Sequence, residues 1–296
     1  MQAIQLCMKD NMGDISPVGL TKIWATPSTH QISVLLPTRG RTDMLKRSLL
    51  SLLELAQTPS EIEIMLAFDN DDQESLEWCK ENIFPELERC GVDAMVIEFT
   101  PLGYLKLHEY LNALAGLANG NWLMFWNDDA VMQTQNWDQQ ITEHNGKFLC
   151  LRMPTHNQHP YAIFPIVPRD WYYLLGHLSN HQLTDATISQ ISYILNIVKN
   201  IDVEVLHDRF DITGNNHDAT FKNRPMLEGR PDDPRDFNHS TFRNKRLADA
   251  NKIAWYLNRI GQGSEWFERV MLGQQDPWEY MIGKEQDPNR QVSVYA

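Results

Sequence analysis

The chain has 296 residues, of which 42% are hydrophobic and 22% charged, and its formal net charge at pH 7 is -13. These proportions are typical of a globular protein with a sizeable core, which excludes extensive disorder, and the length fits one α/β unit with an appended segment. The acidic balance disfavours nucleic acid and anionic lipid surfaces as partners, but a single nucleoside diphosphate remains compatible because a divalent cation and a few basic side chains can neutralise it.

Residues 1–30 show little hydrophobic periodicity, so we expect a lead-in with at most one short edge strand. The first residues have no basic segment followed by an apolar core, and no later run approaches about 18 apolar residues. The cysteines lack zinc-like spacing, which predicts reduced thiols. They are Cys7, Cys79, Cys90 and Cys150. These features predict a cytoplasmic protein without a transmembrane segment.

From Ile32 onward, strand-like and helix-like segments alternate. Short apolar or β-branched runs predict strands at residues 32–38, 61–69, 94–99 and 122–126. Apolar residues at helical spacing predict helices between them. These residues are Leu45, Leu49, Leu52, Leu53 and Ala56 in the first helix, a segment through Trp78 in the second, and Leu107, Leu111, Leu114, Ala115 and Ala118 in the third, which Gly120 ends.

This alternation predicts an α/β fold with a mostly parallel sheet and helices on both faces. Ligands of such sheets bind beyond the carboxyl ends of the strands. We therefore expect the turn after Pro37, the acids after Phe68 and the acids after Trp126 to be neighbours in space.

The second half has a looser pattern. We expect strands at 147–153 and 203–207, and helices at 168–176, with Pro168 in its first position, and at 184–196. A loop rich in Asn, Arg, Pro and Asp follows Asp211, and two tail helices, each capped by Ser or Thr, are expected at 241–260 and 264–272. The predicted division is a lead-in at 1–30, a catalytic domain at 31–211 with halves 31–135 and 136–211, and a lid loop with a helical C-terminal segment at 212–296.

Adjacent carboxylates mark the end of the fourth strand, in Asn127-Asp128-Asp129. Two carboxylates where a buried strand emerges repel each other, and a bound Mg²⁺ or Mn²⁺ removes that cost while offering positions to diphosphate oxygens. A solvated acidic turn is the alternative. The aromatic residues of the preceding strand, which include Trp122 and Trp126, favour the metal interpretation.

The first strand ends in Pro37-Thr38-Arg39-Gly40-Arg41. Arg pairs bidentately with phosphate, and the N-terminus of a following helix adds backbone donors. Asp69, which ends the second strand, is suited to accept hydrogen bonds from a ribose or a base. We therefore expect these residues to bind a nucleotide.

In this order, the Pro-Thr-Arg-Gly-Arg turn, Asp69, the segment LeuAsnAlaLeuAlaGlyLeuAlaAsnGly and TrpLeuMetPheTrpAsnAspAsp resemble the nucleotide-binding half of family 2-like GT-A glycosyltransferases. The resemblance covers roughly residues 31–135. It implies a GT-A type, Rossmann-like sheet with a C-terminal helical tail. The last carboxylate of the family's Asp-x-Asp motif binds the metal, so Asp129 keeps the implied metal role, assisted by Asp128. Asn127 stands where the family has the first carboxylate of this motif.

The resemblance implies transfer of a sugar from a nucleoside-diphosphate-sugar to a glycan or other hydroxyl acceptor. It further implies an inverting reaction with Mn²⁺ or Mg²⁺ as cofactor. Its candidate general base is Asp185 at the start of the helix 184–196, for which an ordinary first-turn acid is the alternative. His207 is a candidate third metal ligand, with core packing as the alternative. The expected nucleotide-sugar-binding residues are Pro37, Thr38, Arg39, Arg41, Asp69, Lys106 and Asp128.

Two other functions stay open. One is nucleotidyl transfer to a sugar phosphate, which normally uses a Gly-rich loop where this chain has one glycine, Gly40. The other is a catalytically inactive carbohydrate or nucleotide-sugar-binding protein on the same fold, an option kept open by Asn127.

Overall fold

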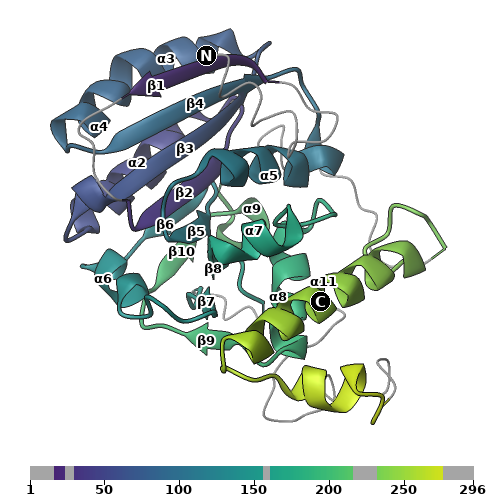
Figure 1. Ribbon diagram of the computed structural model, residues 1–296. Helices are drawn as coiled ribbons and strands as arrows, with labels where there is room; N and C mark the ends of the chain where they lie inside the picture. The colour runs from purple at the N-terminus through teal and green to yellow at the C-terminus, as the bar shows by residue number, and fades with distance from the viewer. Residues whose placement is uncertain (1–16, 24–29, 156–160, 216–231, 276–296) are drawn as a thin grey trace.

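The computed structural model describes residues 17–23, 30–155, 161–215 and 232–275. Within them, eight strands form the main sheet in the order β1-β4-β3-β2-β5-β8-β7-β9 (Figure 1). Most of the predicted lead-in, part of the predicted lid loop (216–231) and the last residues of the predicted tail (276–296) lie outside the described residues.

The centre of this sheet is parallel. It consists of β2 (Ile32–Pro37), β3 (Ile62–Asp69), β4 (Asp93–Phe99) and β5 (Trp122–Phe125). Leu35 of β2 is in register with Met65 on one side and Phe125 on the other, so neighbouring strands end at a common edge. The sequence predicted all four strands because each is a nearly continuous apolar run, as strands covered on both faces require.

Shorter strands extend the sheet on both sides. At one edge, β1 (Pro17–Ile23) pairs antiparallel with β4, which confirms the expected edge strand. On the other side, β8 (Ile166–Pro168) is antiparallel to β5, β7 (Cys150–Arg152) is antiparallel to β8, and β9 (Val198–Asn200) is parallel to β7. The sheet is therefore mostly parallel, with antiparallel pairings outside its central strands.

Helices cover both faces, because alternate residues along each strand point to opposite sides. Val34 and Leu36 pack in one cluster, whereas Leu35 packs in the other. The first cluster includes residues of α2 (Thr42–Leu55), α3 (Gln73–Asn82), α4 (Phe84–Arg89) and α6 (Trp137–Thr142). The second includes residues of α5 (Leu107–Leu117), α7 (Asp170–Leu175), α8 (Thr184–Ile194) and α11 (Ser240–Arg259).

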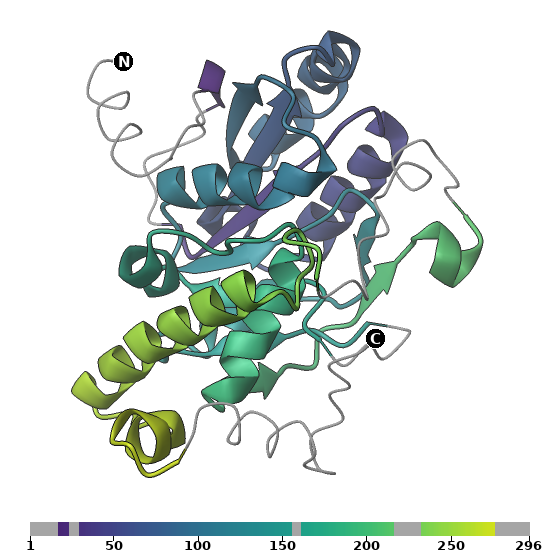
Figure 2. The ribbon, with the colours of Figure 1, turned by 90° about the vertical axis from the view of Figure 1, so that its right-hand side faces the viewer.

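The C-terminal helix α11 is part of this second layer. Its residues Ala250, Ile253, Ala254 and Leu257 are buried in the same cluster as α5 and α8. Figure 2 shows α11, in yellow-green, running along the outside of the molecule. The expected helical tail is thus present and contributes to the main core. No helix in the described part of the chain is long and apolar enough to cross a bilayer.

Two predicted boundaries were wrong. Pro168 does not begin a helix but ends β8, opposite Trp122, and α7 starts only at Asp170. The cap of α11 is neither Ser nor Thr: His239 precedes the helix, and its Nδ1 accepts a hydrogen bond from the backbone N–H of Thr241 at 3.3 Å. The expected strand at 147–153 is shorter, and β6 (Ala130–Met132), α4, α6, β8 and β9 were not predicted.

The remaining described elements are short. They are η1 (Pro59–Glu61), η2 (Tyr104–Lys106), β10 (Val205–His207), α9 (Phe210–Thr213) and η3 (Phe267–Met271). Of these, β10 matters most for the site, because it pairs antiparallel with β6 in a separate two-stranded sheet.

Candidate nucleotide-sugar site

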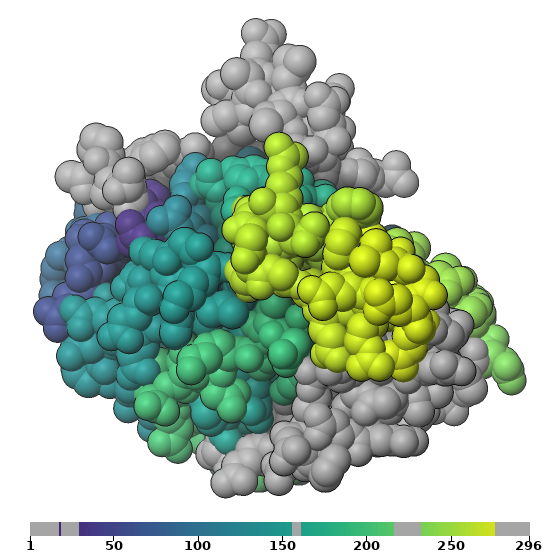
Figure 3. Space-filling view, turned by 60° about the horizontal axis from the view of Figure 1, so that its bottom comes forward, coloured from purple at the N-terminus to yellow at the C-terminus, as the bar shows by residue number. Residues whose placement is uncertain are grey.

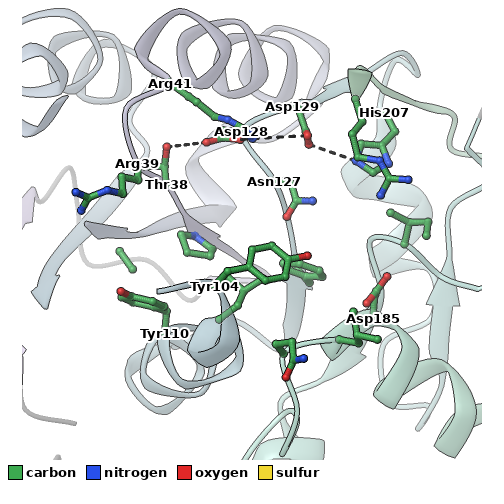
Figure 4. A pocket seen from close by; sticks show the side chains of 18 of the residues that line it. Thr38, Arg39, Arg41, Tyr104, Tyr110, Asn127, Asp128, Asp129, Asp185 and His207 are labelled. Atoms are coloured by element: carbon green, nitrogen blue, oxygen red, sulfur yellow. Dashed lines mark hydrogen bonds and ion pairs between the residues drawn. The ribbon is translucent and has the colours of Figure 1, made fainter. Parts of the chain in front are cut away.

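A cavity of about 440 Å³ lies beyond the carboxyl ends of β2, β3 and β5 (Figure 4). Nine of the ten predicted site residues line it, from segments up to 170 positions apart in the chain. They are Pro37, Thr38, Arg39, Arg41, Asp69, Asp128, Asp129, Asp185 and His207. The predicted residues therefore share one cavity beyond the carboxyl ends of the strands, where ligand sites of parallel sheets lie.

Lys106 is the one predicted site residue that does not line the cavity. It closes η2 outside the cavity lining, and its ammonium forms an ion pair with Glu109 one turn further on. The side chain is 55% exposed. Because the helix offers a carboxylate at i+3, the lysine lies along the helix surface and away from the cavity.

The turn after β2 separates its two arginines. Gly40 has a φ of +63°, a conformation that glycine adopts without steric cost, and its N–H donates to the carboxylate of Asp72 at 2.8 Å. Arg39 on one side reaches Asp69 at 2.7 Å, and Arg41 on the other reaches Asp128 at 2.8 Å. The glycine thus lets one short turn supply guanidinium groups to two strand ends.

Asp128 is held from two sides. Its Oδ1 accepts a hydrogen bond from Arg41 and its Oδ2 accepts one from the hydroxyl of Thr38 at 2.9 Å. Burial raises the pKa of Asp128 to about 6, against the opposing effect of Arg41 and with the charge of Asp129 adding to it. Both oxygens of Asp128 are engaged, and Asp128 holds the guanidinium of Arg41 in place. Its expected role as an assisting metal ligand stays a prediction.

Asp129 lies on the other side of the turn, next to His207. The register of β10 and β6 pairs His207 with Ala130, and the backbone N–H of Asp208 donates to the carbonyl oxygen of Asp129 at 2.8 Å. These contacts bring His207 Nε2 within 3.4 Å of Asp129 Oδ1. Burial alone would raise the pKa of Asp129, but the effects of His207 and Arg41 outweigh it and lower the pKa.

The Asp129–His207 pair fits a divalent cation as a two-ligand site. Asp129 is buried, and the imidazole nitrogen Nε2 of His207 faces its Oδ1 at 3.4 Å. Among the residues that the structure describes, no group of three or more His, Cys, Asp or Glu is arranged to hold a metal ion. Mg²⁺-type ions commonly take one or two protein ligands and complete their shell with phosphate oxygens and water, so two ligands are sufficient.

Asp69 anchors the other end of the cavity. Its Oδ2 accepts from Arg39, and its Oδ1 accepts from the hydroxyl of Tyr110, which in turn accepts from the N–H of Leu102 at 2.8 Å. Burial, followed by the bond to Asp69, raises the pKa of Tyr110, so the hydroxyl remains a donor. Asp69 is therefore a fixed acceptor whose position depends on Arg39 and Tyr110.

Asp185 lies across the cavity from these groups (Figure 4). It occupies the first turn of α8, as predicted, and is partly exposed. Burial raises its pKa, which favours a carboxyl group able to take up a proton. Asp185 and the two carboxylates that follow β5, Asp128 and Asp129, line the same cavity, which leaves room for a ligand between them.

The family model for glycosyl transferase family 2 matches residues 33–201, more than half of the 296 residues. The chain belongs to glycosyl transferase family 2. No curated protein matches the chain.

Solved structures share the fold of this family 2 member at low sequence identity. The structure of Staphylococcus aureus TarS 1-349 in complex with UDP has a TM-score of 0.50 and 14% identity, and the match covers 86% of this chain and 79% of that one. The mannosyltransferase PcManGT from Pyrobaculum calidifontis, in complex with GDP-Man and Mn²⁺, has a TM-score of 0.46 and 12% identity over 96% and 92% of the two chains. The match to another TarS structure covers only 36% of that chain. The likeness to TarS 1-349 confirms the GT-A type fold.

Several lining residues of this family 2 chain were not predicted as site residues. They include Tyr104, Tyr110, Tyr161, Gln182 and Arg209. Tyr110 lies within the apolar spacing of α5 and is indistinguishable there from a core residue. Arg209 carried a usable signal, because it follows the predicted strand end at His207 by two positions.

Proposed function

We propose that this family 2 member transfers a sugar from a nucleoside-diphosphate-sugar to a hydroxyl acceptor, with inversion and with Mn²⁺ or Mg²⁺. The observation that carries the proposal is the content of a single cavity: two arginines, an Asp–His pair and, across from them, Asp185. TarS 1-349, whose fold this chain shares, was crystallised with UDP. A nucleoside diphosphate is the corresponding leaving group proposed here.

The donor nucleotide lies, in this proposal, along the strand ends. Arg39 and Arg41 supply guanidinium donors at the end of β2, which suit phosphate oxygens, and Pro37 and Thr38 line the cavity beside them. Asp69, held by Arg39 and Tyr110, provides the acceptor for a ribose hydroxyl or a base N–H. Arg41 already neutralises Asp128, so this carboxylate does not repel the incoming diphosphate.

The metal ion, in this proposal, is held by Asp129 Oδ1 and His207 Nε2. When bound, it neutralises charge that develops on the departing diphosphate. Asn127 lines the cavity beside this pair and offers an amide to the diphosphate or the sugar.

Asp185 acts as the proposed general base. It takes the proton from the acceptor hydroxyl while the acceptor oxygen forms a bond to the anomeric carbon and the bond from that carbon to the diphosphate breaks. Attack from the side opposite the leaving group inverts the configuration. The raised pKa of Asp185 makes it a stronger base than an ordinary Asp.

The test is a screen of common nucleotide sugars with Mn²⁺ and Mg²⁺, in which release of nucleoside diphosphate and calorimetric binding are both measured. We expect metal-dependent binding and turnover of one donor class. Asp185→Asn should retain donor binding and lose transfer, and Lys106→Ala, altered outside the cavity, serves as the matched control with unchanged behaviour.

Three results would contradict the proposal. Absence of binding and turnover with all donors would remove the transferase assignment. Release of pyrophosphate from a nucleoside triphosphate and a sugar phosphate would indicate a nucleotidyltransferase. Binding without metal dependence or turnover, unchanged in Asp185→Asn, would indicate a binding protein.

A further inference from the structure

The outer face of α11 is basic, although the chain as a whole has a net charge of -13. Within α11, residues three or four positions apart are exposed along one side of the helix. They are Thr241, Asn244, Lys245, Ala248, Lys252, Trp255, Asn258 and Arg259. None of them is acidic, and the single acid of the helix, Asp249, is buried and paired with His177 at 2.9 Å.

Large apolar side chains accompany these charges. Trp255 is 59% exposed and makes an edge contact with Phe267 of η3, with ring centroids 4.8 Å apart. Ile260, directly after the helix, and Leu272, directly after η3, are also exposed. Figure 3 shows this C-terminal part of the chain, in yellow, lying on the surface. Lys245, Lys252, Trp255 and Arg259, with Ile260 and Leu272, are called the α11 face below.

We propose that the α11 face docks on a membrane surface that contains anionic lipid. Lys and Arg attract the phosphates of the headgroups, and Trp and aliphatic side chains enter the boundary between headgroups and acyl chains. Apolar residues at the end of the face favour a bilayer over nucleic acid, whose phosphate backbone offers nothing to cover them. This docking does not depend on the proposed transferase activity.

The overall negative charge does not prevent this docking. At physiological ionic strength, charges are screened beyond about 8 Å, so binding to a membrane depends on the charge of the contacting surface and little on the net charge of the chain. Of the neighbouring acids, Glu265 is neutralised by an ion pair with Arg269 at 3.1 Å, whereas Asp170 keeps its charge and accepts a hydrogen bond from Tyr256 at 2.8 Å. Glu268 is the exposed acid of η3. The three basic residues of the α11 face therefore make the net charge of this surface positive.

The experiment compares co-sedimentation of the full chain with vesicles of phosphatidylcholine alone and of phosphatidylcholine mixed with phosphatidylglycerol. We expect binding to the mixed vesicles only, and release by high salt. Each basic residue contributes about fivefold to such binding, so the triple variant Lys245→Glu, Lys252→Glu and Arg259→Glu should bind at least about 100-fold more weakly. Trp255→Ser should also weaken binding, without changing the net charge.

The matched control reverses three exposed lysines elsewhere, Lys80→Glu, Lys147→Glu and Lys199→Glu, and changes the net charge equally. It should bind as the unmodified chain does, and circular dichroism should show both triple variants folded. The proposal is overturned if the unmodified chain does not co-sediment with the mixed vesicles, or if both triple variants lose binding equally. Displacement of the chain from vesicles by duplex DNA at lower concentration than by free phosphatidylglycerol vesicles would also overturn it, in favour of a nucleic-acid surface.

Discussion

Replacing Asp208 by Asn tests how much the carboxylate that follows His207 stabilises the fold. Asp208 follows His207 directly and is 3% exposed. Its carboxylate accepts hydrogen bonds from the Thr213 hydroxyl at 2.6 Å, from the Asn215 amide at 3.1 Å and from the guanidinium of Arg47. This carboxylate therefore connects residues of the segment after β10 with one another and with α2.

The magnitude follows from the titration of Asp208. Burial alone would raise its pKa, but the bonds from Thr213, Arg47 and Asn215 outweigh burial and lower the pKa from 3.8 to about 2. One pKa unit corresponds to about 1.4 kcal/mol, so the ionised carboxylate stabilises the fold by about 2 kcal/mol relative to its protonated form. Because the folded-state pKa is depressed, this stability is present above about pH 4 and is lost as the pH falls towards about 2.

Urea unfolding of the unmodified chain and of Asp208→Asn measures this effect. We expect a difference of about 2 kcal/mol near pH 7 and about half of that near pH 3. Asp202→Asn, in which the altered side chain is exposed, is the control and should behave as the unmodified chain. A difference that is equal at both pH values, or an Asp208→Asn variant as stable as the control near pH 7, would refute the reasoning.

The other predictions concern the proposed chemistry and the packing beneath it. In electron paramagnetic resonance, Mn²⁺ should bind the free chain weakly and more tightly with UDP, and Asp129→Asn should lower its affinity at least about tenfold whereas Asp128→Asn should lower it less. Asp185→Asn should reduce transfer by about 10²-fold to 10⁴-fold. As the pH is lowered, the rate of the unmodified enzyme should decrease through a pKa above the ordinary Asp value, because protonation removes the general base. Gly120→Ala should cost about 3 kcal/mol in urea unfolding, since its Cβ would lie 2.5 Å from Ser33 Oγ and 2.6 Å from Ser33 N.

The sequence predicts the central sheet because burial on both faces leaves a strong signal. The four central strands, of four to eight residues, are mainly apolar, and two of the helices between them show a clear apolar spacing. Strands of three residues, such as β6 and β8, are too short to show a period of two. Their existence depends on pairing with distant segments, which local pattern does not contain.

The site was predicted in kind but not in its contacts. Arg39, Arg41 and Asp69 follow from the strand ends, because parallel strands share one edge. The ammonium group of Lys106 is suited to bind phosphate, but it forms an ion pair with Glu109 at i+3. The pairing of β10 with β6, which brings His207 to Asp129, is a contact over more than 70 residues that no spacing reveals.

Adjacent residues of one acidic turn share Arg41 but differ in their other partners. Asp128 accepts hydrogen bonds from Thr38 and Arg41, whereas Asp129 lies next to His207 and is 3.7 Å from Arg41 through its second oxygen. Arg41 supplies the positive charge that a metal ion would otherwise have to supply to Asp128, and Asn127 contributes an amide without charge. Asp129 Oδ1 and His207 Nε2, which lie 3.4 Å apart, are the proposed ligands of the ion. With only two protein ligands, the ion would depend on phosphate oxygens and water for its other contacts, so in the proposed function it would bind together with the diphosphate. Asn127, which lines the same cavity, would offer an amide there without adding a negative charge.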